Sequence, residues 1–339
     1  MKNICKVKNT VLQMEKLIAL NAFVTYNSDN IILKDEIKWF QLKAVRKMEL
    51  INISGNTFYI PGKTNIGLVK YGDGVVLIDS GNDKEAGRKL RQLLDSEGLK
   101  VKYILNTHSN ADHIGANAYL MNQYNCDSYS YGLEVIFSKH PELESSFLYG
   151  GFPTSNMKNK FLMAKACQMK DISELETDIE YFKIDGHFHD MVAYKTLDNV
   201  YFLGDSLFPK DIIEKYHLFY ILDVKSYLET LTILEKLNDE GDAYFVPSHG
   251  VLSTNIKEVI DLNRNKILEV IELIKTLASN KISFDQLFKA ILDKYKITLD
   301  LNQYLLVGST IRNYLSYLYE QGKIGFVFED NILYYLKKD

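Results

Sequence analysis

Short runs of alternating hydrophobic and polar residues begin at about residue 49 and predict β-strands. Two of them, LINISGNTFYI (50–60) and NIGLVKYGDGVVLIDSG (65–81), are rich in β-branched residues, and Gly72-Asp73-Gly74 in the second one indicates a hairpin turn. The next stretch (83–100) carries an apolar helical stripe, and VKYILNTH (101–108) is typical of a buried strand that ends in a polar loop. Strands alternating with helices favour sheet layers with helices outside them, and an α+β fold class.

The second half of the chain continues this alternation. Residues 131–180 have a mixed helical pattern and a Gly-rich turn at 149–153, which predicts an insertion over the sheet edge that shapes a pocket. The following segments predict three strands, a helix, one more strand and a long helix: 179–186, 191–199, 200–205, 225–239, 243–250 and about 256–277.

Four regions follow from these patterns. Residues 1–47 are an N-terminal extension of unknown role, with helix-compatible spacing over 35–47, and residues 48–255 form the main domain. Residues 256–282 are a connecting helix. Residues 283–339 contain helical stripes and then a hairpin that turns near Asp330-Asn331, which is the order of a winged-helix-like domain.

Composition narrows the possible partners and the compartment. The net charge of −4 and the sequence pI near 6.0 give no basic field that would recruit nucleic acid or an anionic membrane. The three cysteines form no CxxC pair, which predicts free thiols in a reducing compartment. The first segment lacks a secretory cleavage site, and no apolar run reaches the ~18 residues of a membrane span. We therefore expect a cytoplasmic protein without a membrane partner.

The strongest chemical signal is the segment THSNADHIG (107–115), at the end of a predicted strand. Imidazoles and a carboxylate in one loop are ligands of a divalent cation. Three more ligand-type residues, His187, Asp205 and His249, each lie near the end of a predicted strand, so all of them could meet at one sheet edge. Burying these groups without a counter-ion would be costly, so a metal site explains them better than a purely structural role.

These motifs resemble those of the metallo-β-lactamase superfamily, whose loop has the pattern His-x-His-x-Asp-His. The resemblance spans about residues 49–255 and implies a four-layer αββα sandwich. It also implies that His108 and His187 bind a first metal, that Asp112, His113 and His249 bind a second, and that Asp205 bridges them. Asp79 matches an acid that orients a ligand in the family, although an Asp-Ser-Gly turn also explains it without a metal.

One departure from the family pattern is Asn110, which stands where the second histidine is expected. A neutral amide is a poorer zinc ligand than imidazole, so we expect one tightly bound ion and a second that is weak or absent. Alternatively, Asn110 holds a water or a substrate oxygen while another metal is used. Zinc is the favoured metal, with iron or manganese as alternatives. His189 is either a substitute ligand, a proton shuttle, or an ordinary outer or surface histidine.

The resemblance implies a metal-dependent hydrolase in which Asp112 and Asp205 orient a metal-bound hydroxide. The substrate would be a small molecule with an ester, thioester or related bond. Two alternatives stay open: a catalytically impaired binding or regulatory protein, and a metal-dependent (ribo)nuclease, because a superfamily branch with a winged helix includes an endoribonuclease. The tail from Ser283 carries equal numbers of acidic and basic residues, so we expect it to pack or to form a homodimer rather than to bind nucleic acid.

Overall fold

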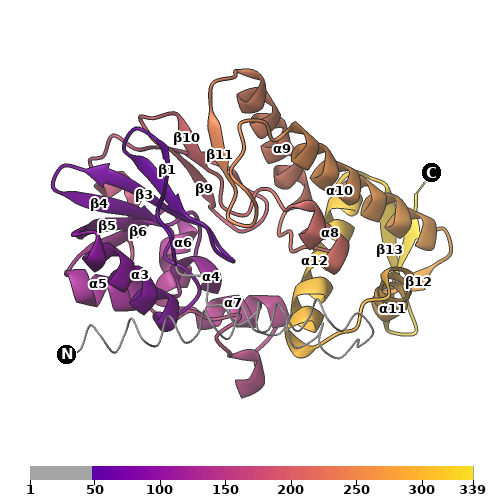
Figure 1. Ribbon diagram of the computed structural model, residues 1–339. Helices are drawn as coiled ribbons and strands as arrows, with labels where there is room; N and C mark the ends of the chain where they lie inside the picture. The colour runs from indigo at the N-terminus through magenta and orange to yellow at the C-terminus, as the bar shows by residue number, and fades with distance from the viewer. Residues whose placement is uncertain (1–47, 339) are drawn as a thin grey trace, which may run out of the picture. The chain divides into compact units, whose positions relative to one another are not determined.

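The computed structural model describes residues 48–338, so the predictions for residues 1–47 lie outside the described residues. Its first sheet contains strands β1 to β7 in chain order, antiparallel from β1 to β4 and parallel from β4 to β7 (Figure 1). The strands are β1 (Ile51–Ser54), β2 (Thr57–Ile60), β3 (Ile66–Tyr71), β4 (Gly74–Ile78), β5 (Val101–Leu105), β6 (Asp127–Ser130) and β7 (Lys170–Asp171). The predicted hairpin turn at residues 72–74 is confirmed, since it joins β3 to β4.

A second sheet has the order β11-β10-β9-β8, with a parallel pair between β10 and β11. Its strands are β8 (Glu180–Lys183), β9 (Val192–Lys195), β10 (Val200–Phe202) and β11 (Tyr244–Val246). All four lie within the segments that the sequence pattern predicts as strands.

The two sheets share an apolar core, and β4 shows how one strand serves two layers. Val76 and Ile78 join the cluster that also contains Tyr194 and Phe202 of the second sheet. Val75 and Leu77, on the opposite face of β4, join a different cluster that contains residues of the neighbouring helices. Because successive side chains of a strand point to opposite faces, a fully apolar strand is explained by burial on both sides.

Helices cover the outer faces of both sheets (Figure 1). On the first sheet these are α3 (Lys84–Ser96) and α5 (Asn117–Tyr124), with Asp83 capping α3 through the amides of Glu85 and Ala86. On the second sheet they are α8 (Lys210–Tyr216), α9 (Val224–Asp239) and α10 (Lys257–Leu277). The result is the predicted helix–sheet–sheet–helix layering. No helix within residues 48–338 has both the length and the apolar character that a membrane crossing needs.

Residues 131–180 carry short elements rather than a continuous layer. They are α6 (Leu133–Lys139), α7 (Glu142–Tyr149), the 3-10 turns η1 (Ser155–Met157) and η2 (Ile172–Glu174), and β7. Leu148, Met157 and Leu162 of this insertion form a small core with Leu305 and Leu306 from the C-terminal part of the chain. Cys126 and Cys167 are free thiols, as predicted.

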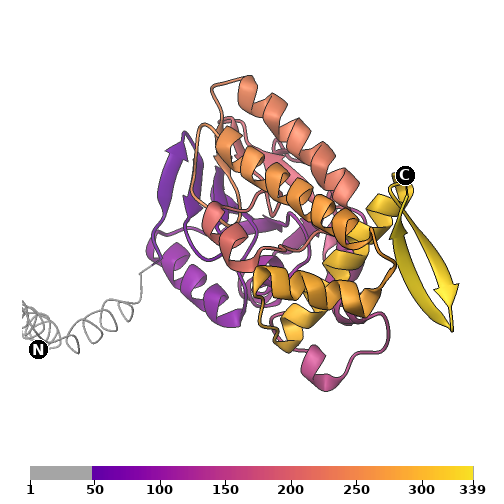
Figure 2. The ribbon, with the colours of Figure 1, turned by 90° about the vertical axis from the view of Figure 1, so that its right-hand side faces the viewer.

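The C-terminal part contains two helices and a third sheet of order β12-β14-β13. In chain order its elements are β12 (Ile282–Ser283), α11 (Phe284–Tyr295), α12 (Leu301–Glu320), β13 (Ile324–Glu329) and β14 (Ile332–Lys337). Asp330 and Asn331 both have positive φ, so the predicted turn is confirmed, and the hairpin extends away from the helices in Figure 2. Asp300 caps the start of helix α12, because its side chain accepts a hydrogen bond from the Gln303 amide.

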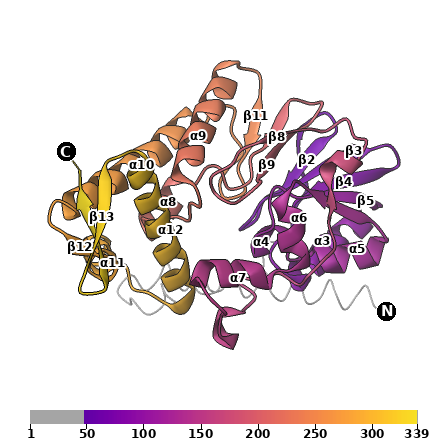
Figure 3. The ribbon, with the colours of Figure 1, turned by 180° about the vertical axis from the view of Figure 1, so that it is seen from behind.

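Helix α12 also contacts α7, as Figure 3 shows from behind. Side-chain bonds also join the C-terminal part to the rest of the chain. Among them, Asn159 donates to Asn302 Oδ1 at 2.8 Å, and Asn313 donates to the carbonyl of Ile221 at 2.8 Å. The C-terminal part is therefore packed against the insertion and the second sheet's helices.

Asn263 of α10 is fully buried and holds the backbone of Phe208. Its Oδ1 accepts from the Phe208 amide at 3.1 Å, and its Nδ2 donates to the Phe208 carbonyl at 2.8 Å. We expect Asn263→Leu to lower the free energy of unfolding by about 2–4 kcal/mol, because two buried backbone groups lose their partner. Denaturant unfolding measures this loss. Asn265→Leu, on the exposed side of the same helix, is the control, and equal stabilities of the two variants would contradict the prediction.

Candidate metal centre

The loop after β5 brings most of the predicted site residues together. After β5 the chain passes through Thr107 and His108 and enters the one-turn helix α4 (Ala111–Ile114), which carries Asp112 and His113. His108 and His113 are fully buried, and their rings lie 3.9 Å apart between centroids. A buried strand that ends in this loop therefore fixes both imidazoles without long flexible segments.

Asp112, His113 and His249 form one group of potential ligands, with all donor atoms within 4.8 Å of one another. His249 Nε2 lies 3.2 Å from Asp112 Oδ2, and His113 Nε2 lies 3.7 Å from the same oxygen. Thr64 donates a hydrogen bond to Asp112 Oδ2 at 3.0 Å, which orients the carboxylate. These are the three residues that the family resemblance assigns to the second metal.

Asp205 lies at the centre of the remaining residues. It follows Gly204 just after β10, and its carboxylate is 3.2 Å from His113 Nε2, 3.3 Å from His249 Nε2 and 3.6 Å from His187 Nε2. A second potential ligand group contains His108, His113 and Asp205. The structure thus places Asp205 between the two predicted sets, as a bridging carboxylate requires.

In each of the four imidazoles the Nδ1 atom has an outer partner, while Nε2 faces the shared centre. The partners are Thr107 Oγ1 for His108 (3.0 Å), Asp79 Oδ2 for His113 (2.8 Å), the Tyr220 carbonyl for His187 (3.0 Å) and the Lys63 carbonyl for His249 (2.7 Å). A carbonyl can only accept, so Nδ1 of His187 and His249 carries the proton. This arrangement leaves Nε2 free to bind a metal.

Three buried polar atoms at the centre have no hydrogen-bond partner among the described residues: His108 Nε2, His113 Nε2 and Asp205 Oδ1. Buried donors and acceptors without partners are costly, and here they face one another. Imidazole nitrogen and carboxylate oxygen are ligands of divalent metals. The residues present therefore fit a metal ion.

Electrostatics point to the same centre. Burial alone would lower the pKa of His249, but the Asp205 and Asp112 carboxylates raise it to about 11. Burial opposes ionisation of Asp205, yet His249 and His113 hold the pKa of its carboxyl well below the usual range. Burial lowers the pKa of His108, which is thus neutral and ready to act as a ligand. Protons and a metal cation therefore compete for the same imidazole and carboxylate groups.

Asp79 lies directly behind His113. Besides that ring nitrogen, its carboxylate accepts from the Thr107 amide and the Thr107 hydroxyl, each at 2.9 Å. Its φ of +61° is unusual for a residue other than glycine and marks a constrained turn at the end of β4. The side chain therefore couples the strand end to the orientation of His113 and to the THSNADHIG loop.

Asn110 lies beside His187. Its Oδ1 is 3.2 Å from His187 Nε2, and its Nδ2 donates to Glu144 Oε1 at 2.9 Å. Burial, with the carboxylates of Glu134 and Asp112 nearby, raises the pKa of the Glu144 carboxyl well above its usual value. Glu134 is also buried and accepts from the Ser109 amide at 2.7 Å. Sequence reasoning missed both glutamates, since acidic residues in a short amphipathic helix usually face solvent.

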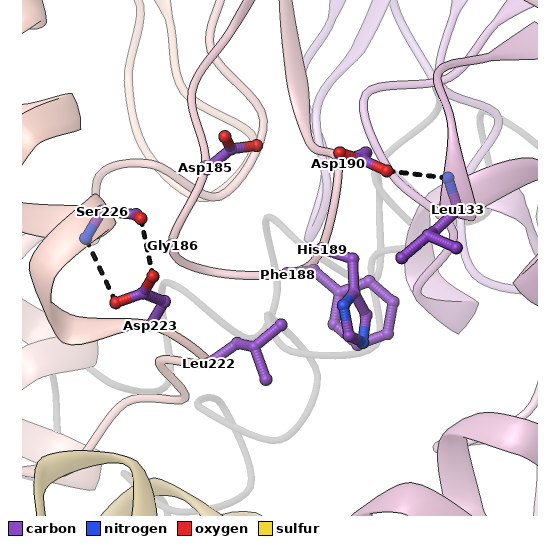
Figure 4. Close-up of a pocket in the computed structure, with 9 residues that line it drawn as sticks. All are labelled: Leu133, Asp185, Gly186, Phe188, His189, Asp190, Leu222, Asp223 and Ser226. Atoms are coloured by element: carbon purple, nitrogen blue, oxygen red, sulfur yellow. Dashed lines mark hydrogen bonds between the residues drawn. The ribbon is translucent and has the colours of Figure 1, made fainter. Parts of the chain in front are cut away.

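His189 is not brought to the centre by any contact in the structure. Residues 187–190 form a bend rather than a strand, and the His189 ring stacks on Phe137 with centroids 4.9 Å apart. Figure 4 shows it in a separate small pocket whose rim carries Asp185, Asp190 and Asp223. His140 lies near Glu142, and His217 stacks on Tyr295, both outside the metal centre.

Comparison with known proteins agrees with this geometry. A model of the Metallo-beta-lactamase superfamily matches residues 59–249, which is more than half of the chain. The structure is similar to that of a beta-lactamase domain protein from Burkholderia ambifaria (TM-score 0.67, 17% identity, covering 88% of this chain and 96% of that one). It is also similar to a metallo-beta-lactamase family protein from Thermus thermophilus (TM-score 0.62, 17% identity, covering 87% of this chain and 99% of that one).

Identities this low show the fold alone. The match to the family model includes every residue from Asp79 to His249 that contributes to the centre described above. The α+β architecture with two mixed sheets is that of the same fold. The chain belongs to the metallo-beta-lactamase superfamily, whose members are typically metal-dependent hydrolases.

Proposed function

We propose that this protein is a metal-dependent hydrolase that cleaves an ester, a thioester or a related bond in a small molecule. The observation that carries the proposal is the set of buried, unpartnered atoms of His108, His113 and Asp205 that face one another. A bound divalent ion supplies Lewis acidity and makes water nucleophilic at neutral pH. Zinc is the favoured ion because imidazole dominates the ligand set, with iron or manganese as alternatives.

The residues of the centre have different roles. His113, His249 and Asp112 hold one ion, and their side chains include the accessible edge of the site, since Asp112 is 39% and His249 20% exposed. His108 and His187 are almost fully buried and hold the other, weaker position, and Asp205, also buried, bridges the two positions. Asp112 and Asp205 offer carboxylate oxygens that can accept the protons of a water and orient it toward a substrate that enters from the accessible edge.

We also propose that the C-terminal part is a winged-helix-like unit with a packing role. The order β12, α11, α12, β13, β14 after α10, with β14 between β12 and β13, supports this assignment. Its contact with α7 and its balanced charge favour support of the catalytic domain, or a homodimer, over binding of nucleic acid. The cytoplasmic location stays a prediction from the sequence.

The site assignment is tested by Asp112→Ala and His249→Ala. We expect each variant to lose metal affinity and turnover by more than about 100-fold, because loss of a direct ligand costs more than loss of an outer partner. Elemental analysis and hydrolysis of a panel of small esters and thioesters measure both effects. His140→Ala, at an exposed histidine outside the centre, is the control. Unchanged metal content in both ligand variants would refute the assignment, and failure of the native protein to bind metal would favour a binding protein.

Metal binding should release protons. The pKa of His249 is raised to about 11 and that of His113 well above its usual value, so both rings are protonated at neutral pH until a cation displaces the proton. Affinity should therefore rise with pH. Calorimetric titration with zinc in two buffers of different ionisation enthalpy counts the protons released. Equal heats in both buffers would contradict the expectation.

Asn110→His should strengthen the first metal position, because imidazole replaces a neutral amide beside His187. The expected result is a second metal equivalent that survives gel filtration. Asn122→His, on the outer helix α5, is the control. An unchanged stoichiometry would mean that residue 110 does not reach the metal.

A further inference from the structure

Glu144 is a buried carboxylate of α7 that the catalytic machinery described so far does not use. It is 7% exposed, and the Asn110 amide is the hydrogen-bond donor that the described residues supply to its side chain, at 2.9 Å. A carboxylate at such a position is costly unless a cation or several donors compensate it. The structure supplies one neutral donor, and the raised pKa of the Glu144 carboxyl is the consequence.

The orientation of Asn110 follows from this bond. Glu144 Oε1 accepts the hydrogen bond from Asn110 Nδ2, so the Oδ1 of the same amide is turned toward the centre of the site. There Oδ1 lies 3.2 Å from His187 Nε2, an atom assigned to the first metal. The amide oxygen thus occupies the corner where the family pattern expects an imidazole.

The position of Glu144 is fixed by packing far from the centre. Leu148, on the next turn of α7, belongs to the small core with Leu305 and Leu306 of α12, and α7 and α12 are in contact (Figure 3). The neighbouring Ser145 donates to the Met157 carbonyl at 3.0 Å. Helix α7 is therefore held on both sides, and Glu144 cannot move away from Asn110 without disrupting this core.

We propose that Glu144 is a positioning residue that turns the Asn110 amide oxygen toward the first metal, so that a carboxylate–amide pair replaces the missing imidazole. The inference rests on the proposed function, since it concerns the same centre. The hydrogen bond that Asn110 Nδ2 donates to Glu144 polarises the amide and strengthens its oxygen as a ligand, much as an outer hydrogen-bond acceptor does for a metal-bound imidazole. With the amide oxygen in place of an imidazole, the first position becomes richer in oxygen than the family pattern would make it, so its preference shifts from zinc toward manganese.

The experiment titrates manganese and zinc separately into the metal-free full-length protein and its variants by equilibrium dialysis, with cobalt absorption as a spectroscopic check. Glu144→Leu removes the partner, Glu144→Gln keeps an accepting oxygen but removes the carboxyl group, and Glu142→Leu, on the exposed face of α7, is the matched control. Asn110→Ala and the double variant Asn110→Ala/Glu144→Leu test whether the two residues act together. His249→Ala reports on the second position.

We expect Glu144→Leu to weaken the lower-affinity equivalent about 10–100-fold, with a changed cobalt spectrum, while the tight equivalent and the control stay unchanged. Glu144→Gln should lie between Glu144→Leu and the native protein, and it decides the test if Glu144→Leu fails to fold. In the Asn110→Ala background, Glu144→Leu should have no further effect.

The inference is overturned by native affinity in both Glu144 variants, by equal losses with and without Asn110, or by binding of one equivalent even at high metal concentration. These results leave the proposed function intact as long as His249→Ala loses the tight equivalent. If His249→Ala keeps that equivalent, the site assignment itself fails.

Discussion

Compensation of buried charge at the shared end of the two sheets is the constraint on which the rest of this structure depends. His108, His113 and Asp205 are removed from water, and their inward nitrogen and oxygen atoms make no hydrogen bond within the described residues. Such groups are tolerated where a cation joins them. The cation requires the ligands that follow β5, β10 and β11 to converge. The register of both sheets and the loops after these strands must therefore bring these side chains to one place.

The loops meet this demand through a few special backbone positions. Gly186 has φ +119° and lies so close to Tyr227 that a Cβ at position 186 would be 2.3 Å from the Tyr227 backbone nitrogen. The absence of a side chain here lets the chain pass close to Tyr227 and brings His187 to the centre. Gly204, at φ +53°, precedes Asp205 and packs on Thr107. Asp79 adopts the same left-handed region at the end of β4 while it accepts bonds from Thr107 and His113. Side chains elsewhere in the two sheets serve mainly the apolar cores that hold these loops in place.

The sequence could predict which candidate ligands lie together because each one lies near the end of an apolar run, where position along a strand determines position at the sheet edge. His108, His187, Asp205 and His249 are of this kind. Glu144 and Glu134 could not be predicted, because their burial depends on the packing of the insertion, and for α7 on Leu305 of a helix far along the chain. For His189 the local backbone differs from the one that the pattern favours. In a strand, the rings of His187 and His189 would lie on one face, but residues 187–190 form a bend.

The resulting centre is asymmetric. Asp112, His113 and His249 all match the family pattern and include the exposed edge of the centre, while His108 and His187 are buried, and Asn110 beside His187 stands where that pattern has an imidazole. An amide oxygen is a harder ligand than an imidazole nitrogen, so Asn110 changes which metal the first position prefers. The burial of a position also affects how easily its metal ion is exchanged. Because α7 packs on α12, the stability of the C-terminal part is linked to the first position through Glu144 and Asn110.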